Sequence, residues 1–511
     1  MVACFLLALG TGVIDPWMTP QFSARQVAQV KSFWADPSRF RADDQLAQGS
    51  GGPYIAAATA EGSTWLHAYY KAVYPGQHIL PDRDMVPLTA AQKQADSWLE
   101  RRIEADWAAA TQEALALNEG RRPPARPTAE PPPFSSPWGP VPSFAGPHRA
   151  KRYTVLFPEC AVFAQDAAKV RRKFPYLRCV DGVDILGSTT AGLTWQNALR
   201  KSKASPQACR VLQAVADLEG AFDSVNTYDT GRLSVGIVQF ATMAGGQGSL
   251  GEMLLAYKRS DRDSFQQTFP KFGVDVTPLG VLTVVDPATG WEFQGPAAVR
   301  RVQSDPRLAA VFCRAGRLSE GYQAVQVKMA LALFWPGEKS VGWTVANRNY
   351  SARLVDIFRS DAGMATLFDR SVNTGDLSPV LATVREAASR IGAKSAADLA
   401  AQESRLMQAL RYRKDFTVVA GLSRPAELYA SSTPGPMQGS VLPPATPEAW
   451  RPTGKPTKPE AAKEPEQKLP EGADPRYAVP LGPPAEERKP EDFESPLKKK
   501  PNEKAPSQAG G

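Results

Sequence analysis

Hydrophobic residues recur at helical spacing in the first part of the chain. Between residues 90 and 118 the apolar positions follow one another at roughly helical intervals, which predicts a long amphipathic helix. These positions are Trp98, Ile103, Trp107 and Ala110.

A second strong pattern begins at residue 205. Apolar residues fall there at positions i, i+4, i+7 and i+11, which predicts a helix with a buried stripe that ends near Gly220. The stripe consists of Val211, Val215, Leu218 and Phe222. Turn residues and then β-branched residues follow over 226–240, and this order predicts a hairpin.

The rest of the chain up to residue 413 is mostly helical in pattern. Short β-like runs occur at 153–157 and 183–187. Further helices are expected over 296–315, 318–335, 349–370, 378–391 and 395–413. We therefore expect an α+β fold that is mainly α, with a small β element near the start of the middle part of the chain.

Prolines mark the expected domain boundaries. Ten of the 46 prolines lie in residues 121–150, and eighteen lie in 431–511. The first stretch predicts an extended linker, and the second, which has few large apolar residues, predicts disorder. The expected parts are a possible truncated signal segment (1–15), a helical N-terminal module (16–120), a linker (121–149), a folded domain (150–430) and a disordered tail (431–511).

The net charge of +8 is concentrated in the middle of the chain. Residues 151–430 hold 35 Lys and Arg against 26 Asp and Glu, whereas both flanks are nearly neutral. This excess favours an anionic partner such as a cell-wall polymer, nucleic acid or lipid headgroups. The short basic clusters at 171–173 and 498–500 belong to no nucleic-acid-binding motif, so no nucleic-acid partner is expected.

Histidine is scarce, and this limits the possible chemistry. The three histidines are His67, His78 and His148, so nothing after residue 148 can supply an imidazole. Ser-His-Asp triads, Cys-His pairs and the usual catalytic zinc sites are therefore excluded from the folded domain. The chemistry of that domain must come from carboxylates, hydroxyls, amides, Lys or Arg.

The five cysteines form no CxxC pair, which argues against a structural zinc site or a redox motif. They are Cys4, Cys160, Cys179, Cys209 and Cys313. If Cys4 is removed by processing, the other four allow two disulfides, and buried free thiols are the alternative.

The N-terminus, MVACFLLALGTG, resembles a shortened signal-peptide core that lacks its basic region. We therefore expect an exported protein, periplasmic or extracellular, whose true start lies upstream. No later stretch reaches the ~18 apolar residues that a transmembrane helix needs, so no transmembrane segment is expected.

Carboxyl groups surround the end of the helix predicted from residue 205. Glu219 lies beside the buried Leu218, and partial desolvation at such a junction would favour a protonated general acid. Asp223 and Asp229 follow, and glycoside hydrolysis uses two carboxyls. Ser234 and Gln239 add a hydroxyl and an amide that could position water or a sugar.

The string E-G-x-F-D-x-x-N…S-x-G-x-x-Q-F over 219–240 resembles the catalytic region of the lysozyme-like superfamily, including goose-type lysozymes and lytic transglycosylases. YDTGRLSVGIVQF is similar to the chitosanase motif D-G-R-G-Y-T-x-G-I-x-G-F. GSLGEMLLAY, LFDRSVNTGD and ESRLMQALRYR resemble later segments of that family, so the resemblance spans about 200–415. It implies a lysozyme-like, two-lobed domain with a small β-hairpin.

The resemblance also implies a role for individual residues. Glu219 matches the general acid and Asp229 the second carboxylate, which activates water. Ser234 stands where chitosanases have a water-positioning Thr, and Asn373 stands near their His. The loop between Glu219 and Asp229 is shorter than in chitosanases, so Asp223 in place of Asp229, or no second acid, remain alternatives.

Residues beside these acids are expected to bind the substrate. Asn226 is a candidate partner for a sugar, and Tyr228 and Phe240 are the best candidates for aromatic residues in a cleft, whereas Trp335 is expected in the core. No cofactor and no metal are expected, and the oligomeric state is left open.

The expected activity is cleavage of a β-1,4 bond in an amino-sugar polymer. The basic domain favours peptidoglycan, whose peptides carry carboxylates, over cationic chitosan. Three alternatives remain: a chitosanase with an acidic groove, a non-catalytic wall-binding protein whose Glu219 faces solvent, and a phage-like or toxin-like lytic protein.

Overall fold

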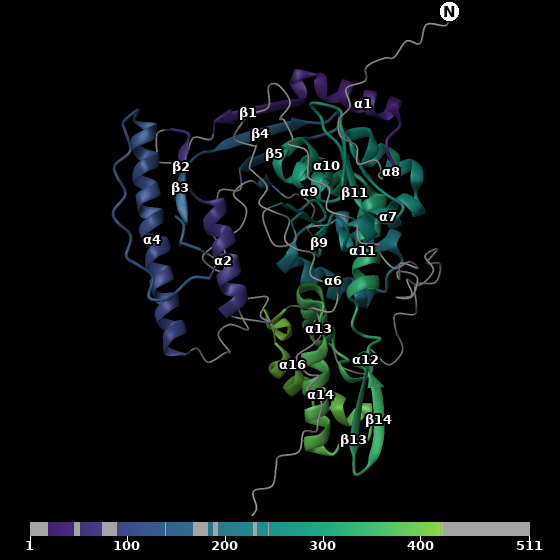
Figure 1. The fold of residues 1–511 in the computed structure, drawn as a ribbon. Helices are drawn as coiled ribbons and strands as arrows, with labels where there is room; N and C mark the ends of the chain where they lie inside the picture. The colour runs from purple at the N-terminus through teal and green to yellow at the C-terminus, as the bar shows by residue number, and fades with distance from the viewer. Residues whose placement is uncertain are drawn as a thin grey trace, which may run out of the picture. The chain divides into compact units, whose positions relative to one another are not determined.

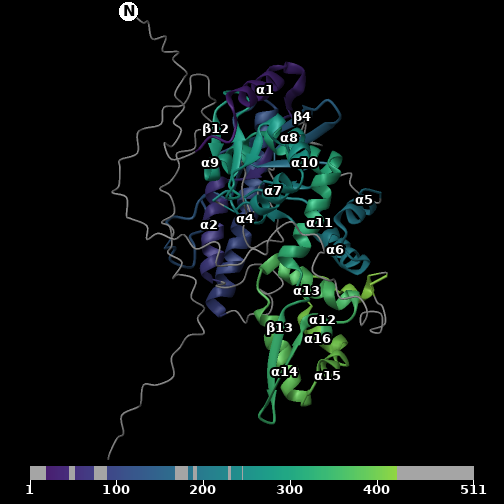
Figure 2. The same cartoon turned by 90° about the vertical axis from the view of Figure 1, so that its right-hand side faces the viewer.

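The computed structural model describes residues 19–44, 52–73, 89–137, 139–166, 182–187, 193–227, 232–243, 245–411, 413–419 and 421–422. These residues form a mixed α/β fold in which helices predominate and the sheets are small and antiparallel (Figures 1 and 2). The segments expected as a signal (1–15) and a tail (431–511) lie outside them.

The largest sheet has seven antiparallel strands that come from distant parts of the chain. Their order is β1 (Phe40–Asp44), β4 (Lys151–Leu156), β5 (Ala161–Asp166), β6 (Val183–Leu186), β7 (Val225–Asn226), β8 (Ser234–Val235) and β9 (Phe240–Ala241). The predicted hairpin over 226–240 supplies its last three strands, and the β-like runs at 153–157 and 183–187 supply β4 and β6.

Three smaller antiparallel sheets complete the described strands. One contains β10 (Val274–Val276), β11 (Leu282–Val285) and β12 (Glu292–Gln294); the two-stranded ones pair β13 (Ser340–Val345) with β14 (Arg348–Arg353) and β2 (Tyr54–Ala58) with β3 (Ala145–Arg149). The sequence pattern predicts none of these three sheets.

The described α-helices are α1 (Ala24–Ala35), α2 (Ala60–Val73), α4 (Ala90–Asn118), α5 (Leu193–Ser202), α6 (Pro206–Glu219), α7 (Ser249–Ser260), α8 (Arg262–Thr268), α9 (Gly295–Ser304), α10 (Pro306–Leu318), α11 (Glu320–Phe334), α12 (Leu354–Ile357), α13 (Asp361–Thr374), α14 (Ser378–Ile391), α15 (Ala396–Ala400) and α16 (Glu403–Leu410). The helices predicted at 90–118, from 205, at 318–335 and at 378–391 are confirmed as α4, α6, α11 and α14. None of the described helices combines the length and apolarity that crossing a bilayer requires.

Two of the predicted helical segments are divided, and a third begins as a strand. The segment expected over 395–413 is divided into α15 and α16. The one expected over 296–315 is split at Asp305, whose extended backbone precedes Pro306, because a residue before proline disfavours the helical region. The one expected over 349–370 begins as strand β14, since Ala346 and Asn347 both take positive φ and turn the chain into a hairpin.

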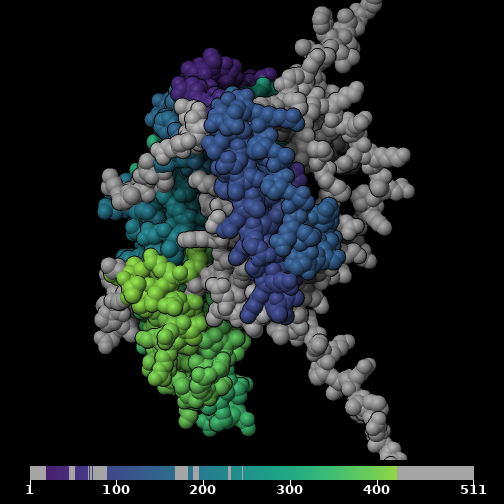
Figure 3. Space-filling view, turned by 90° about the vertical axis from the view of Figure 1, so that its left-hand side faces the viewer, coloured from purple at the N-terminus to yellow at the C-terminus, as the bar shows by residue number. Residues whose placement is uncertain are grey.

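The expected N-terminal module does not stand apart as a whole. Phe22, Val30 and Trp34 of the α1 region belong to the same buried cluster as the middle part of the chain, and the Trp34 indole donates to the carbonyl of Phe272 at 3.1 Å. Helices α2 and α4 instead bury a small core of their own around Trp65 and Trp98. Figure 3 shows the outer face of this pair of helices in blue.

The proline-rich segment expected as an extended linker packs against that second core. Phe134, Val141 and Phe144 contact the cluster around Trp65, and the Phe144 amide donates to Asp106 at 2.8 Å. The segment ends in β3, which pairs with β2. Most of it lacks helix or strand, as its prolines predict, but its aromatic residues hold it in place.

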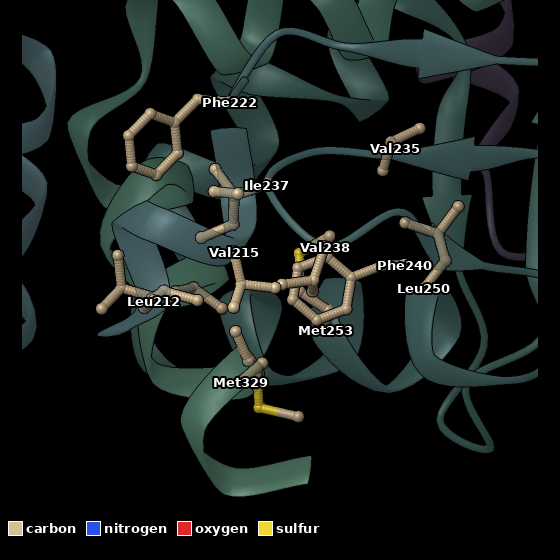
Figure 4. Close-up of a cluster of buried hydrophobic side chains, with 14 of the residues drawn as sticks. Leu212, Val215, Phe222, Val235, Ile237, Val238, Phe240, Leu250, Met253 and Met329 are labelled. Carbon is tan, nitrogen blue, oxygen red and sulfur yellow. The ribbon is translucent and has the colours of Figure 1, made fainter. Parts of the chain in front are cut away.

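Part of the main hydrophobic core lies between α6 and the strands that follow it. Figure 4 shows Val215 of α6 close to Val238, Phe240 and Met253, all of which are buried. This packing holds the end of α6, where Glu219 lies, against strands β7 to β9.

One buried side chain ties that arrangement together. The Gln326 side chain on α11 is inaccessible to solvent; its amide nitrogen donates to the Phe222 carbonyl at 3.0 Å, and its oxygen accepts from the Ile237 amide at 3.2 Å. A Cβ at Gly236, where φ is +79°, would lie 2.1 Å from the same Gln326 oxygen. Gly236 therefore allows the close approach of β8 to α11.

This packing predicts that Gly236→Ala destabilises the protein more than a glycine replacement of similar backbone strain. Gly392→Ala is the matched control, since its φ is +64° and a Cβ there would meet nothing within 4 Å. We expect Gly392→Ala to cost about 1–2 kcal/mol, for the left-handed backbone alone. Gly236→Ala should cost at least about 3 kcal/mol, since strain and overpacking add. Chemical denaturation measures both, and equal losses would contradict the steric argument.

Candidate active site

Glu219 is the last residue of α6, and Gly220 caps the helix by donating its amide to the carbonyl of Ala216. The helix begins with a Ser205 side chain that accepts from the Ala208 amide, and its buried face presses on the core. The Glu219 side chain is only 6% exposed. The structure therefore gives this carboxyl the partly desolvated position at a helix end that the sequence predicts.

Two side chains hold the carboxylate of Glu219. The Asn373 side-chain nitrogen donates to Glu219 Oε1 at 2.9 Å, and Arg413 Nη2 donates to the same oxygen. Asn373 comes from α13, which contacts α6 and lies beside it in Figures 1 and 2. Asn373 therefore reaches Glu219 from a position 154 residues later in the chain.

Arg413 is shared between Glu219 and a second buried carboxylate, Asp369. Its Nε donates to Asp369 Oδ1 at 3.0 Å, and its Nη2 also reaches that oxygen. Burial opposes the charge on Arg413, but the hydrogen bond to Asp369 and the nearby charge of Glu219 outweigh it, so the pKa of Arg413 is raised. One guanidinium therefore stays charged between two carboxylates.

Asp369 depends strongly on this contact. Its side chain is 1% exposed, and its Oδ2 has no hydrogen-bond partner among the described residues. A buried carboxylate oxygen without a partner is costly, so the ion pair with Arg413 has to support it. Neither Asp369 nor Arg413 was among the predicted site residues, although both lie in segments that carry the resemblance.

A cavity of about 320 Å³ opens beside Glu219. It is lined by Asp184, Ile185, Leu218, Glu219, Asp223, Ser224, Val225, Asn226, Ser234 and Gln239. Five predicted site residues, from a helix end, a loop and two strands, therefore meet around one polar cavity. These five are Glu219, Asp223, Asn226, Ser234 and Gln239.

Gln239 connects the strands to the helix end. Its side-chain nitrogen donates to the main-chain carbonyl of Glu219 at 2.8 Å, and its own φ is +52°. This bond fixes the turn before β9 against the last residue of α6. Gln239 thus positions Glu219 and also lines the cavity.

Asp223 has a different surrounding from the one expected of a substrate ligand. Its side chain has no exposed surface, and Arg317 Nε donates to its Oδ2 at 2.9 Å. Arg317 also donates to the main-chain carbonyls of Ala161 and Gly187. These contacts make Asp223 part of a buried ion pair that ties the loop after α6 to the ends of β5 and β6.

The proposed second carboxylate, Asp229, and its neighbour Tyr228 lie outside the described residues. A different acid, Asp184, lines the cavity from β6, where it is paired in register with Asn226. The Gln165 side-chain nitrogen donates to Asp184 Oδ2 at 3.4 Å. Asp184 was missed because it precedes Glu219 by 35 residues, and only the strand pairing brings the two acids to one cavity.

The prediction that Phe240 lines the cleft is wrong. Its ring has no exposed surface and packs in the core, 6.4 Å from the ring of Phe334. In the sheet, Phe240 pairs with the buried Val235, so it points to the core side. Trp335 packs against the core, with its ring 6.1 Å from that of Phe368, as expected.

The described part of the chain contains no group of three or more side chains that could hold a metal ion. Cys160, Cys209 and Cys313 are free thiols. Burial raises the pKa of Cys209 to about 11 and that of Cys313 to about 12, so both stay protonated and inert at neutral pH. Cys4 and Cys179 lie outside the described residues.

The geometry around Glu219 can support proton transfer to a bound ligand. A shielded carboxyl, an amide and a guanidinium meet beside a polar cavity that is large enough to admit part of a sugar. Comparisons of the chain with protein-family models, with curated proteins and with solved structures found no match.

Proposed function

We propose that this protein is a lysozyme-like glycoside hydrolase that cleaves β-1,4 bonds of an amino-sugar polymer, with Glu219 as the general acid. The observation that carries the proposal is the 6% exposed carboxyl of Glu219 at a helix end, beside a cavity lined by Asn226, Ser234 and Gln239. Protonation of a glycosidic oxygen requires a shielded acid within reach of the bound sugar.

In the proposed mechanism the neighbours of Glu219 set its orientation. Asn373 and Arg413 both donate to Oε1. We therefore assign proton donation to Oε2. Arg413 also pairs with Asp369, and the negative charge of Asp369 offsets part of the attraction between Arg413 and Glu219. Ser234 is proposed to position the attacking water.

The second carboxylate is proposed from the resemblance to be Asp229. An inverting reaction needs the two carboxyl groups about 6.5–9.5 Å apart, with water between them. Asp184 lines the cavity as well, and we assign it a role in binding sugar hydroxyls. A lytic reaction with Glu219 alone is the alternative.

Peptidoglycan is the proposed substrate, because residues 151–430 carry a net charge of +9. One observation favours chitosan as the second candidate. The cavity is lined by the acids Asp184 and Glu219 and, among the described residues, by no Lys or Arg, although Arg413 pairs with Glu219. An exported location follows from either substrate and is part of the proposal.

A non-catalytic wall-binding protein would need no shielded acid. That alternative predicts Glu219 in solvent with no cavity beside it, and the burial and contacts of Glu219 speak against it. A phage-like or toxin-like lytic protein would use the same chemistry and differs only in its delivery.

We expect Glu219→Gln to lower the hydrolysis of peptidoglycan at least about 10³-fold, since an amide cannot donate the proton. Zymography and release of reducing ends, on peptidoglycan and on chitosan, measure the loss and the preferred polymer. Glu386→Gln is the control, because the side chain of Glu386 is 68% exposed and pairs with Arg390 at the surface. Equal clearing by Glu219→Gln and wild type would exclude the catalytic role.

Replacing each of the other two acids separates their roles. We expect Asp229→Asn to reduce kcat about 10²-fold or more, as loss of a general base does. Asp184→Asn should mainly raise KM, by about tenfold, because it removes a charged hydrogen-bond acceptor for the substrate. A larger loss of kcat in Asp184→Asn than in Asp229→Asn would assign the second carboxylate to Asp184.

Arg413→Gln should destabilise the protein, because it leaves the buried Asp369 carboxylate without its ion pair. We expect a loss of about 3–5 kcal/mol, the cost of removing one partner of a buried pair. Arg405→Gln, an exposed change on α16, is the control. Chemical denaturation measures both variants, and equal losses would contradict this role of Arg413.

A further inference from the structure

A row of polar residues crosses the seven-stranded sheet and ends in the cavity. Its members are direct partners on neighbouring strands: Asp43, Arg152, Gln165, Asp184, Asn226 and Ser234. Residues directly opposite one another in an antiparallel sheet point to the same face, so the whole row lies on one face.

Exposure changes steadily along this row. Ser234 is buried, Asn226, Asp184 and Gln165 are partly exposed, and Arg152 and Asp43 are exposed. The three inner members line the cavity beside Glu219. The outer members therefore continue the wall of the cavity onto the open face of β5, β4 and β1, which lie side by side in Figure 1.

An exposed aromatic side chain lies next to the row. Phe163 on β5 is two residues from Gln165, so both point to the same face, and its side chain is 52% exposed. Its cross-strand partners are Thr154 on β4 and Leu186 on β6. A half-exposed Phe beside polar groups presents a flat apolar surface that the core does not use.

We propose that this sheet face is an extended binding site for the glycan strand of peptidoglycan, which runs from the cavity across β6, β5 and β4. The inference rests on the proposed function and adds the course of the substrate. Neighbouring strands lie about 4.8 Å apart, close to the length of one sugar in a β-1,4-linked chain, so each strand can serve one sugar.

Each member of the face has a chemical counterpart in this polymer. Gln165 and Asp184 can bind sugar hydroxyl and acetamido groups, and Phe163 can stack on the apolar face of a pyranose ring. Arg152 supplies a cation for the carboxylates of the peptides that branch from the glycan. Continuity with the cavity, together with this sequence of polar, aromatic and cationic groups, identifies the occupant as the polymer that enters the cavity.

Retention on insoluble, purified peptidoglycan tests the binding face. The full chain with Glu219→Gln is used, so that the polymer is not cleaved. We expect the further change Phe163→Ala to weaken retention about fivefold, the loss that one aromatic contact accounts for. Leu279→Ala is the matched control, because Leu279 is 66% exposed and lies outside the seven-stranded sheet. It should leave retention unchanged.

Substrate length provides a second measurement, on the chain that retains Glu219. A short oligosaccharide fills the cavity without reaching β5 and β4, whereas the polymer covers all three strands. The Phe163→Ala and Arg152→Ser variants should therefore lose more kcat/KM on the polymer than on the oligosaccharide.

The outcomes separate this inference from the proposed function. If the wild type cleaves peptidoglycan but Phe163→Ala behaves like Leu279→Ala on every substrate, the sheet face is not a binding site and the cavity chemistry stands. If Phe163→Ala weakens only retention on chitosan, the face exists but its occupant is wrong. If the wild type neither binds nor cleaves either polymer, both proposals are overturned.

Discussion

The arrangement around Glu219 depends on one shared guanidinium. Arg413 binds the carboxylate at the end of α6 and the buried Asp369 on α13, so it joins two helices that are 150 residues apart in the chain. A single cation between two acids keeps the local charge low enough for both to be buried. Without it, Asp369 would be an uncompensated buried charge, and Glu219 would keep Asn373 as its contact on α13.

Hydrogen bonds to the main chain complete the support of the cavity. Gln326 joins the loop after α6 to the turn after β8, and Gln239 joins the turn before β9 to Glu219 itself. The ion pair of Asp223 with Arg317 ties the loop after α6 to the ends of β5 and β6. Strands of two residues, such as β7 and β8, have few ladder bonds, so these side chains hold the acid and the sheet in a fixed relation.

Helix positions could be predicted well where periodicity is strong, as for α4 and α14, but not where the backbone overrides the apolar pattern. Pro306 divides α9 from α10, and the turn at Ala346 and Asn347 makes the start of the helix expected over 349–370 part of strand β14. The small sheets escaped prediction because strands of three to six residues bear little periodicity and depend on distant partners. The expected linker packs against α2 and α4 because its phenylalanines contact the core around Trp65 and Trp98, which forms only when the chain folds.

For the site, five of the predicted residues between Glu219 and Gln239 line the cavity at the helix end, because a helix and the adjacent hairpin are local structures. The partners of Glu219 needed the tertiary structure: Asp369, Asn373 and Arg413 reach it through helix packing, and Asp184 reaches the cavity through strand register. The burial of Phe240 also depends on the tertiary structure. Alternation of apolar and polar residues along a strand shows which side chains share a face, but it does not show which face packs against the core. The side chains around the end of α6 can therefore be predicted from a short stretch of sequence, because they are close in the chain. The charge partners of Glu219 and the residues that share one face of the sheet come from distant segments, so only the tertiary structure brings them together.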